Sequence, residues 1–381
     1  MYCAWGHQML LSRWLTATFA ATAALLSLSG GRSMASTQPV SDAGPLVNVA
    51  CGKALSSLHP AAGSTLALKR GCSYSGTLTI AADSVTVTAF GSGQDPAITL
   101  RQDGAAVDVF GSDVTVSNLS LTGVAPRSWS CRGQRTPAGH VDGIDIEPGA
   151  LDNTVTDISA SGFYAGVYVN AGSTGNLVEN STFTNNIELD TNNSAGSSGA
   201  FGILLWGSDN TVQNNTISGS QVCSIAFGYD GSAVEVFGGS HNLIVGNHAS
   251  SDDTFTELGS YTGATATSNT FKSNTVSDGS VSHGSTFLVT RGSLDPDGPV
   301  FKTMVTSNSV TLTKPGDQGV VSYAWRPGDG TLLTLTSNYL NLGGHQVLYT
   351  DGGYVDGGGN TLIGTCNPAS ACRPLAPPLV R

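Results

Sequence analysis

One short pattern recurs along the middle of this chain and restricts its fold more than any other feature. An apolar residue, an outward residue and a second apolar residue precede a Gly or Asn turn, and two further strand-like phrases follow many of these segments. Alternating β-branched residues predict strands with one buried face. Three short strands per repeat predict one coil of a parallel β-helix, an all-β solenoid. The clearest copies are Val107-Asp108-Val109, Ile144-Asp145-Ile146, Val167-Tyr168-Val169, Ile203-Leu204-Leu205 and Val234-Glu235-Val236.

Asn residues mark the corners between these strands, as in Asp209-Asn210-Thr211. Asn tolerates left-handed backbone geometry, and its amide can bond the Asn of the next coil. The repeat length varies from 22 residues, between Glu235 and Glu257, to 37 residues, between Asp108 and Asp145, because loops are inserted. Inserted loops on a solenoid usually wall a binding face. They span residues 124–139, 187–200, 220–230 and 292–300.

The first turn, from Ala62 to Leu78, and the coils after it resemble the right-handed parallel β-helix, pectate-lyase-like superfamily of secreted carbohydrate-active proteins. The resemblance covers roughly residues 45–364. It implies a right-handed, single-stranded parallel β-helix with inserted loops, acting on an extracellular poly- or oligosaccharide. The fold hosts lyases, hydrolases, epimerases and non-enzymes, so it leaves the substrate open.

One motif within these coils resembles a particular enzyme family. Val141-Asp142-Gly143-Ile144-Asp145 is similar to the Thr-Asp-Gly-Ile-Asp segment of polygalacturonases. The next coil carries Tyr168 in place of an Asp pair, and the Gly-His-Gly and Arg-Ile-Lys motifs of that family are absent from the sequence. The catalytic residues of polygalacturonases are therefore not carried over to this chain.

The N-terminal 35 residues have the features of an export signal. Arg13 precedes an apolar stretch from Trp14 to Leu28 that is too short to span a bilayer stably, and Ser33-Met34-Ala35 is a small-x-small cleavage site. The alternative is an anchoring helix that stays attached. We therefore expect a signal peptide at residues 1–35 and one β-helix domain at residues 36–381, secreted to the extracellular space or periplasm, with no membrane contact in the mature form.

The cysteines agree with export. Cys3 leaves with the signal, and the even number that remains suggests disulfides in a secreted chain. Proximity in sequence predicts Cys51–Cys72 and Cys366–Cys372, which leaves Cys131–Cys223.

The balance of charge argues against nucleic acid as a partner. The net charge is −11 and no basic cluster occurs, whereas phosphate neutralisation needs Lys and Arg. Only 11% of the residues are charged and 49 are Gly. This composition suits short strands and tight turns better than a helical bundle or a disordered tail.

Stacked repeats place the outward residues in columns, with neighbours about 4.8 Å apart. Two columns, two residues apart along each strand, should share one face. We predict a sugar-binding groove there, because aromatic rings stack on the C–H faces of sugars and carboxylates bond their hydroxyls. The alternative for the rings is a small secondary core beneath the 220–230 loop. The first column is Asp108, Asp145, Tyr168, Leu204, Glu235, Glu257 and Val289, and the second is Phe110, Glu147, Asn170, Trp206, Phe237, Gly259 and Arg291. The predicted substrate-binding residues are Tyr168, Trp206, Phe237, Glu147 and Arg291.

Glu235 and Glu257 are neighbours in the first column and should lie side by side, pointing to solvent. Glycosidases need one carboxylic acid and one carboxylate, and a separation of about 5–5.5 Å favours a retaining reaction. Proximity of like charges should raise the pKa of one glutamate, and the sequence leaves open which one is the acid. Asp145 and Asp230 are further catalytic candidates. No cofactor is required, but Ca²⁺ is possible, and its set of ligands would then be Glu235, Glu257, Asp252 and Asp253.

These features predict a secreted glycan-cleaving enzyme, most simply a glycoside hydrolase with paired carboxylates on the exposed face of the solenoid. One alternative is a Ca²⁺-dependent polysaccharide lyase, in which Arg291 would abstract the proton beside a uronate carboxyl. A second alternative is a non-catalytic β-helix that binds a glycan or a surface partner. An ultraviolet-absorbing product would identify the lyase, and affinity without turnover would identify the binder.

Overall fold

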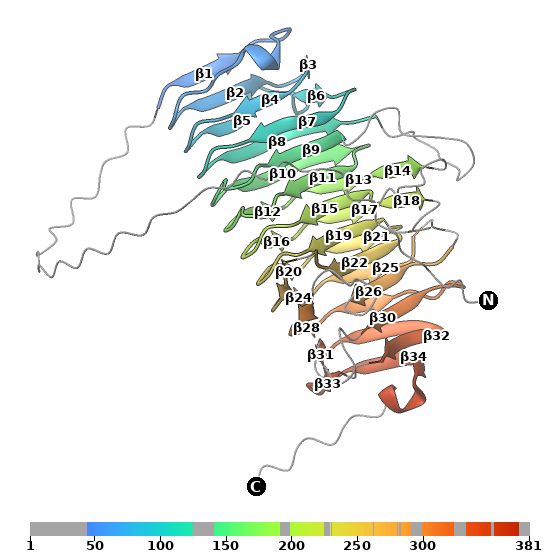
Figure 1. Ribbon diagram of the computed structural model, residues 1–381. Helices are drawn as coiled ribbons and strands as arrows, with labels where there is room; N and C mark the ends of the chain where they lie inside the picture. The colour runs from blue at the N-terminus through green and yellow to red at the C-terminus, as the bar shows by residue number, and fades with distance from the viewer. Residues whose placement is uncertain are drawn as a thin grey trace, which may run out of the picture. The chain divides into compact units, whose positions relative to one another are not determined.

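The strands of this protein run parallel and stack coil upon coil (Figure 1). The computed structural model describes residues 44–124, 141–190, 199–224, 229, 231–261, 263–279, 281, 283–290, 299–323, 333–351 and 354–372. All of them belong to one unit, Gly44–Arg381. The predicted all-β parallel solenoid is confirmed.

Each coil has three sides, which we call sheets 1, 2 and 3, and the chain visits them in the order 2, 3, 1. Sheet 1 contains β4 (Leu78–Ile80), β7 (Gly104–Val109), β9 (Val141–Ile146), β11 (Ala165–Val169), β15 (Phe201–Leu205), β19 (Ser232–Phe237), β22 (Thr254–Gly259), β26 (Thr286–Thr290), β30 (Gln318–Ser322) and the second parts of β32 (Tyr339–Thr350) and β34 (Thr361–Asn367).

Sheet 2 contains β1 (Leu46–Val49), β2 (Thr65–Lys69), β5 (Thr86–Phe90), the first parts of β8 (Thr115–Thr122) and β10 (Thr154–Ser161), β12 (Leu177–Glu179), β16 (Thr211–Gln213), β20 (Leu243–Val245), β24 (Thr270–Lys272), β28 (Thr303–Thr306), β31 (Leu333–Thr336) and β33 (Val355–Asp356). Sheet 3 contains β3 (Ser73–Ser75), β6 (Ala97–Thr99), the second parts of β8 and β10, β13 (Thr182–Thr184), β17 (Thr216–Ser218), β21 (His248–Ser250), β25 (Thr275–Ser277), β29 (Ser309–Thr311) and the first parts of β32 and β34.

A few short elements lie outside these sheets. β14 (Ile187–Asp190) pairs with β18 (Gln221–Ser224), and β23 (Ala266–Thr267) pairs with β27 (Val300–Phe301). The 3-10 helices are η1 (Leu55–Ser57) and η2 (Ala369–Cys372). Among the described residues, no helix has the length and apolar character needed to cross a bilayer.

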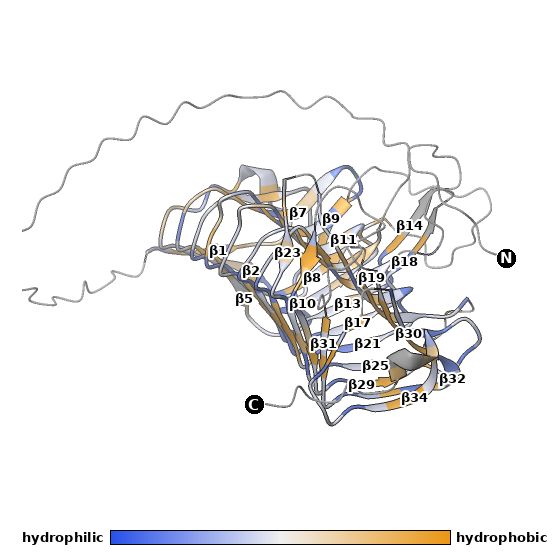
Figure 2. Ribbon diagram, turned by 60° about the horizontal axis from the view of Figure 1, so that its bottom comes forward, coloured by the Kyte–Doolittle hydropathy of each residue, from blue (hydrophilic) through white to orange (hydrophobic). Residues whose placement is uncertain are grey.

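The core runs inside the solenoid as stacks of identical inward positions. Val107, Ile144 and Val167 occupy one such stack on sheet 1 and are fully buried. Figure 2 shows apolar residues repeated in this way on successive strands. Burying each side chain of this size contributes about 1.5–3 kcal/mol relative to leaving it exposed. The alternation read in the sequence therefore fixes which face of every strand turns outward.

Two ladders of buried Asn side chains run along the corners on either side of sheet 2. Between sheets 2 and 3, the backbone N–H of Asn215 donates to Oδ1 of Asn247 at 2.9 Å, and that of Asn247 donates to Oδ1 of Asn274 at 3.0 Å. The second ladder contains Asn153, Asn176, Asn210, Asn242 and Asn269. The predicted stacking is confirmed, but the left-handed residue is the one before each ladder Asn, such as Asn214 with φ 55°.

The third corner, between sheets 3 and 1, uses both an amide and a carboxyl group in the same role. Oδ1 of Asn186 accepts the N–H of Phe163 at 3.1 Å, and Oδ1 of Asp252 accepts the N–H of Ser220 at 2.7 Å. Asp252 is buried, and its Oδ2 has no hydrogen-bond partner. Burial raises the pKa of Asp252 to about 8, although hydrogen bonding from Ser220 opposes the shift. A neutral carboxyl thus takes the place of an amide in this corner.

Asp252→Asn is expected to stabilise the protein by a few degrees in Tm, and more at pH 8 than at pH 5. The folded pKa is about 8 and the unfolded value 3.8, so the folded state holds a proton that the unfolded state loses. The contribution of Asp252 to the stability of the fold is therefore fully present below about pH 4 and decreases as the pH rises towards 8. Thermal melts of both proteins at several pH values measure the difference. Asp157→Asn, at an exposed turn of β10, is the control, and a gain that did not vary with pH would refute the assignment.

Two of the predicted disulfides are present in the described residues. Cys51 pairs with Cys72 and Cys366 pairs with Cys372, with Cα atoms 5.2 and 5.6 Å apart. The predicted Cys131–Cys223 pair lies outside the described side chains, and so does the predicted signal peptide. Strands run from Leu46 to Asn367.

Candidate functional site

The outward columns of sheet 1 have the predicted register. Asp145 pairs with Asp108 on one side and with Tyr168 on the other. Leu204 separates Tyr168 from Glu235, and Glu235 pairs directly with Glu257. Because the pairing is parallel and unbroken across these coils, the acids and rings of both columns share the outer face of sheet 1.

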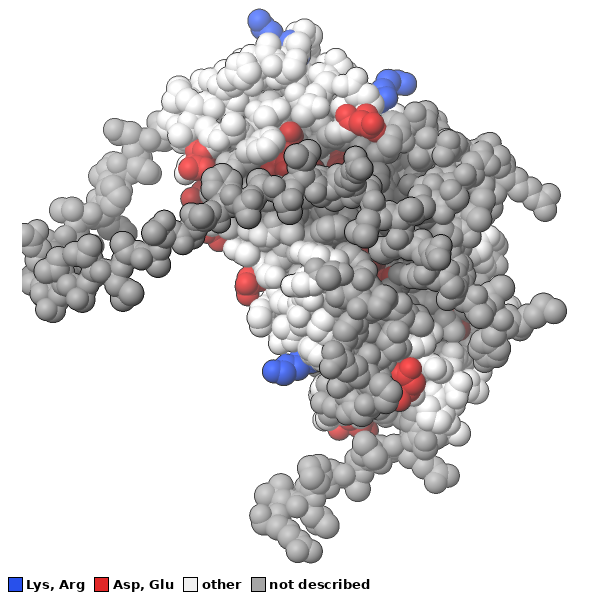
Figure 3. Space-filling model, in the orientation of Figure 1, with Lys and Arg blue, Asp and Glu red and all other residues white. Residues whose placement is uncertain are grey.

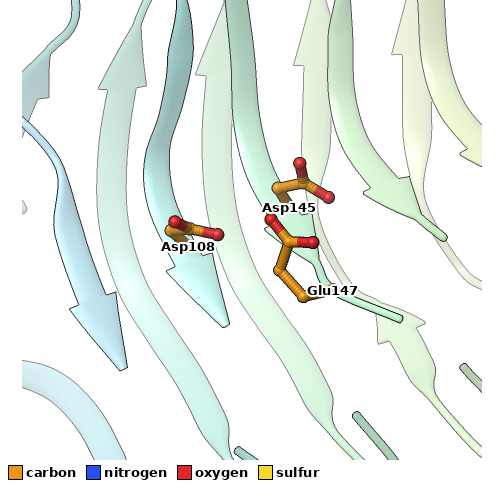
Figure 4. Close-up of side chains that lie close together, drawn as sticks. All are labelled: Asp108, Asp145 and Glu147. Carbon is orange, nitrogen blue, oxygen red and sulfur yellow. The ribbon is translucent and has the colours of Figure 1, made fainter. Parts of the chain in front are cut away.

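Three carboxyl groups meet at the N-terminal part of this face, and we call them the acid cluster: Asp108, Asp145 and Glu147. Asp108 is on β7, Asp145 is on β9, and Glu147 follows β9 directly. Each offers a carboxylate oxygen, and these oxygens lie within 4.8 Å of one another (Figure 4). All three residues are partly exposed. No other group of three His, Cys, Asp or Glu ligands is this close in the part of the chain that the structure describes.

The environment of the acid cluster favours protonated carboxyls. Burial raises the pKa of Asp145 to about 8, and the charges of Asp142, Glu147 and Asp108 add to the shift. Burial also raises the pKa of Asp108 to about 7, with further contributions from hydrogen bonding to Glu147 and from its charge. The site can therefore hold protons at neutral pH, when isolated carboxyl groups would be ionised.

Two neighbours fix the geometry of this cluster. The side-chain amide of Asn170, from the next coil, donates to Oδ1 of Asp145, and this opposes the rise of its pKa. Asp142, three residues before Asp145 on β9, is buried and accepts the N–H of Ala165 at 3.1 Å. Burial raises the pKa of Asp142 to about 7. The Asp142–Asp145 motif noted in the sequence is thus part of the cluster's surroundings.

Aromatic side chains adjoin the acid cluster on the next coils. The ring centroid of Trp206 lies 6.0 Å from that of Tyr168, 5.5 Å from that of Phe237 and 5.4 Å from that of Tyr261. We call these four residues the aromatic patch; all are partly exposed. Tyr168 and Trp206 also pack on a small apolar cluster outside the main core, formed by Ala165, Phe201 and Leu204. The alternative of a core beneath the 220–230 loop stays a prediction, since most side chains of that loop lie outside the described residues.

Glu235 and Glu257 lie side by side, as predicted, but they do not point to solvent. Both side chains are buried, with 6% of each residue exposed. Oε2 of Glu235 accepts the hydroxyl of Ser232 at 2.7 Å, and that hydroxyl lies 2.6 Å from the hydroxyl of Thr254. The expectation of exposure was therefore wrong, and hydroxyl groups of the same two strands lie beside Glu235. The catalytic role of the pair remains a prediction.

Asp252 and Asp253 do not join this pair. Asp253 lies at the third corner, where Oδ2 accepts the N–H groups of Val222 at 2.8 Å and Gly231 at 3.0 Å, and Oδ1 lies 2.7 Å from Nε2 of His283. These contacts tie both ends of the inserted 220–230 loop to the coil. Asp230 and Arg291, also predicted for the site, lie outside the described residues.

Two members of the site were not identified from the sequence. Asp108 stood in the first column without an assigned role, because a 37-residue repeat separates it from Asp145. Tyr261 follows the end of β22 and so falls outside the repeated phrases. The only indication of Tyr261 in the sequence is that it follows Phe237 by slightly more residues than one short coil contains.

Comparison with known proteins agrees with this architecture. Residues 142–340, slightly more than half of the chain, match the family described as right handed beta helix region. The chain therefore belongs to the right-handed β-helix family. No curated protein matches the sequence.

Solved structures with the same fold include phage tailspikes. The tailspike of E. coli bacteriophage HK620 in complex with a pentasaccharide has a TM-score of 0.55 at 12% identity, with 83% of this chain and 59% of that chain covered. A mutant of that tailspike gives 0.56 at 11%, covering 85% and 60%. The Dettilon tailspike gives 0.50 at 15%, covering 80% and 62%. This chain thus spans less than two thirds of each of these proteins.

Proposed function

We propose that this protein hydrolyses an extracellular glycan and that the acid cluster is the cleavage centre. The observation that carries the proposal is the meeting of Asp145 and Glu147, whose carboxylate oxygens lie within 4.8 Å, next to the partly exposed rings of the aromatic patch. A glycoside hydrolase needs a protonated carboxyl and a carboxylate at the scissile bond. Rings beside them bind the C–H faces of sugars.

Each acid has a role in this scheme. Asp145 is protonated at neutral pH because its pKa is about 8, so it donates its proton to the leaving glycosidic oxygen as the C–O bond breaks. Glu147 attacks the anomeric carbon, and the short separation favours this covalent, retaining course. Water then hydrolyses the glycosyl–enzyme bond, and its proton returns to Asp145. Asp108 lies against Glu147 and limits the charge that accumulates there.

The setting supports a polysaccharide as the substrate. The HK620 tailspike, which shares the fold, holds a pentasaccharide in its structure. The disulfides Cys51–Cys72 and Cys366–Cys372 are typical of proteins outside the reducing cytosol. On the face shown in Figure 3, acidic side chains are scattered along the solenoid, and the few basic ones stand apart from one another. We therefore infer secretion and a glycan partner.

A second candidate is a Ca²⁺-dependent polysaccharide lyase. Three carboxylate oxygens within 4.8 Å also form a donor set that Ca²⁺ accepts, since it binds oxygen ligands from several carboxylates. In this case Asp108, Asp145 and Glu147 would be ionised and would hold the ion against a uronate substrate. The two candidates thus assign opposite protonation states to Asp145.

A panel of polysaccharides separates these candidates. We expect the protein to release reducing ends from at least one glycan, without ultraviolet absorbance in the product and with activity unchanged by EDTA. Hydrolysis consumes water and creates no double bond, whereas a lyase product is unsaturated. An absorbing product together with loss of activity in EDTA would establish the lyase, and binding without product would overturn catalysis.

A further inference from the structure

A second pair of rings lies on the outer face of sheet 1, far from the acid cluster. The ring centroids of Tyr323 and Tyr349 are 5.3 Å apart with an interplanar angle of 52°. Both side chains are partly exposed. Neither residue belongs to the repeated phrases of the central coils, and the proposed cleavage centre makes no use of them.

The register places this pair in the same columns as the proposed site. Val289 pairs with Glu257, Val321 pairs with Val289, and Tyr349 pairs with Val321. Tyr323 stands two residues beyond Val321, in the position of the second column. Seven strand spacings separate Asp145 from Tyr349, which is roughly 34 Å along the solenoid.

Polar side chains stand on the same two coils: Asp351 is exposed two residues after Tyr349, and two glutamines lie nearer the beginnings of the strands. Gln318 and Gln346 pair across β30, which Tyr323 follows directly, and β32, which carries Tyr349, and Nε2 of Gln318 donates to Oε1 of Gln346 at 3.1 Å. Both are partly exposed. Aromatic rings match the C–H faces of a sugar, and amide and carboxylate groups on the same coils can bond its hydroxyl groups. The titratable groups with raised pKa that serve cleavage lie on the distant coils of the acid cluster.

We propose that Tyr323 and Tyr349, with Gln318 and Gln346, form a remote, non-catalytic subsite for the same glycan that the acid cluster cleaves. This inference rests on the proposed function and specifies its substrate: a polysaccharide of several sugar residues that runs along sheet 1, with hydroxyl-rich residues at the C-terminal coils. A short oligosaccharide held at the acid cluster does not reach these tyrosines.

The test compares long and short substrates. Tyr323→Ala and Tyr349→Ala are each expected to lower kcat/KM on the polysaccharide by roughly three- to tenfold, the effect of losing one ring contact. The same variants should cleave a trisaccharide of that glycan at the wild-type rate. Tyr339→Ala is the matched control, because Tyr339 is exposed on the same strand, β32, in its sheet 3 part. Thermal melts verify that all three variants are folded.

Equal losses on both substrates, or no loss on the polysaccharide, would overturn the subsite. Affinity electrophoresis in gels containing each polysaccharide separates this failure from failure of the proposed function. If the wild type is retarded but cleaves nothing, and the two variants are retarded less than Tyr339→Ala, the subsite stands and the hydrolase does not. If the variants are retarded like the control, the subsite is refuted whether or not cleavage occurs.

Discussion

Asp145→Asn is expected to lower kcat for glycan cleavage by a factor of roughly 10²–10⁴, the usual contribution of a general acid. The amide keeps the size of the carboxyl and an oxygen that can accept the hydrogen bond from Asn170, but it has no proton to donate to the leaving oxygen. KM should change little, because the rings of the aromatic patch still bind the sugar. Initial rates of reducing-end release measure both quantities.

The pH profile gives an independent view of the same residue. Because the pKa of Asp145 is about 8, activity should fall as pH rises through this value and the proton is lost. The alkaline limb should disappear from the residual activity of Asp145→Asn. Asp157→Asn serves as the control, since Asp157 is exposed on β10 away from sheet 1. Full activity of Asp145→Asn with loss of activity in Glu235→Gln would move the cleavage centre to the buried glutamate pair.

Asn247→Ala is expected to lower the free energy of unfolding by about 2–4 kcal/mol. Oδ1 of Asn247 accepts both the backbone N–H and the side-chain amide of Asn215, and its own amide donates to the carbonyl of Val212 at 2.9 Å. Asn247 is completely buried, so water cannot replace these bonds. Each buried polar group left without a partner costs about 1–3 kcal/mol. Urea unfolding followed by circular dichroism measures the loss.

Two further variants serve as comparisons for the loss of stability in Asn247→Ala. His248→Ala changes the adjacent exposed side chain and should be nearly neutral. Asn247→Ser should be intermediate, because Ser181 already stands in the equivalent position, where its hydroxyl accepts the N–H of Ile158 at 3.1 Å. A loss for Asn247→Ala no larger than that for His248→Ala would show that the ladder contributes little to stability.

Most of the fold was predictable from the sequence because the residue types that recur in each coil strongly prefer either burial or a turn. Apolar stacks such as Val107, Ile144 and Val167 can be buried only on one side of each strand, so the outward columns followed directly. The Asn corners were visible for the same reason. The register of Glu235 with Glu257 was predictable because one uninterrupted coil of 22 residues joins them.

The site was less predictable because burial and side-chain convergence depend on neighbours that no periodic pattern specifies. Glu235 is buried and accepts the hydroxyl of Ser232, which in turn contacts that of Thr254, and the repeat does not specify these contacts. Asp252 was available as a cation ligand by residue type alone, whereas its actual contact is the N–H of Ser220. Asp108 meets Glu147 across a long insertion, where spacing carries little information.

The most direct measurement for the central claim is a crystal structure of Asp145→Asn with a bound oligosaccharide of the glycan that the wild type cleaves. The account predicts a glycosidic oxygen about 3 Å from the side chain at position 145. The carboxylate of Glu147 should face the anomeric carbon, and a sugar ring should stack on Trp206. An oligosaccharide whose scissile bond instead lies at Glu235 and Glu257, with position 145 out of contact, would contradict it.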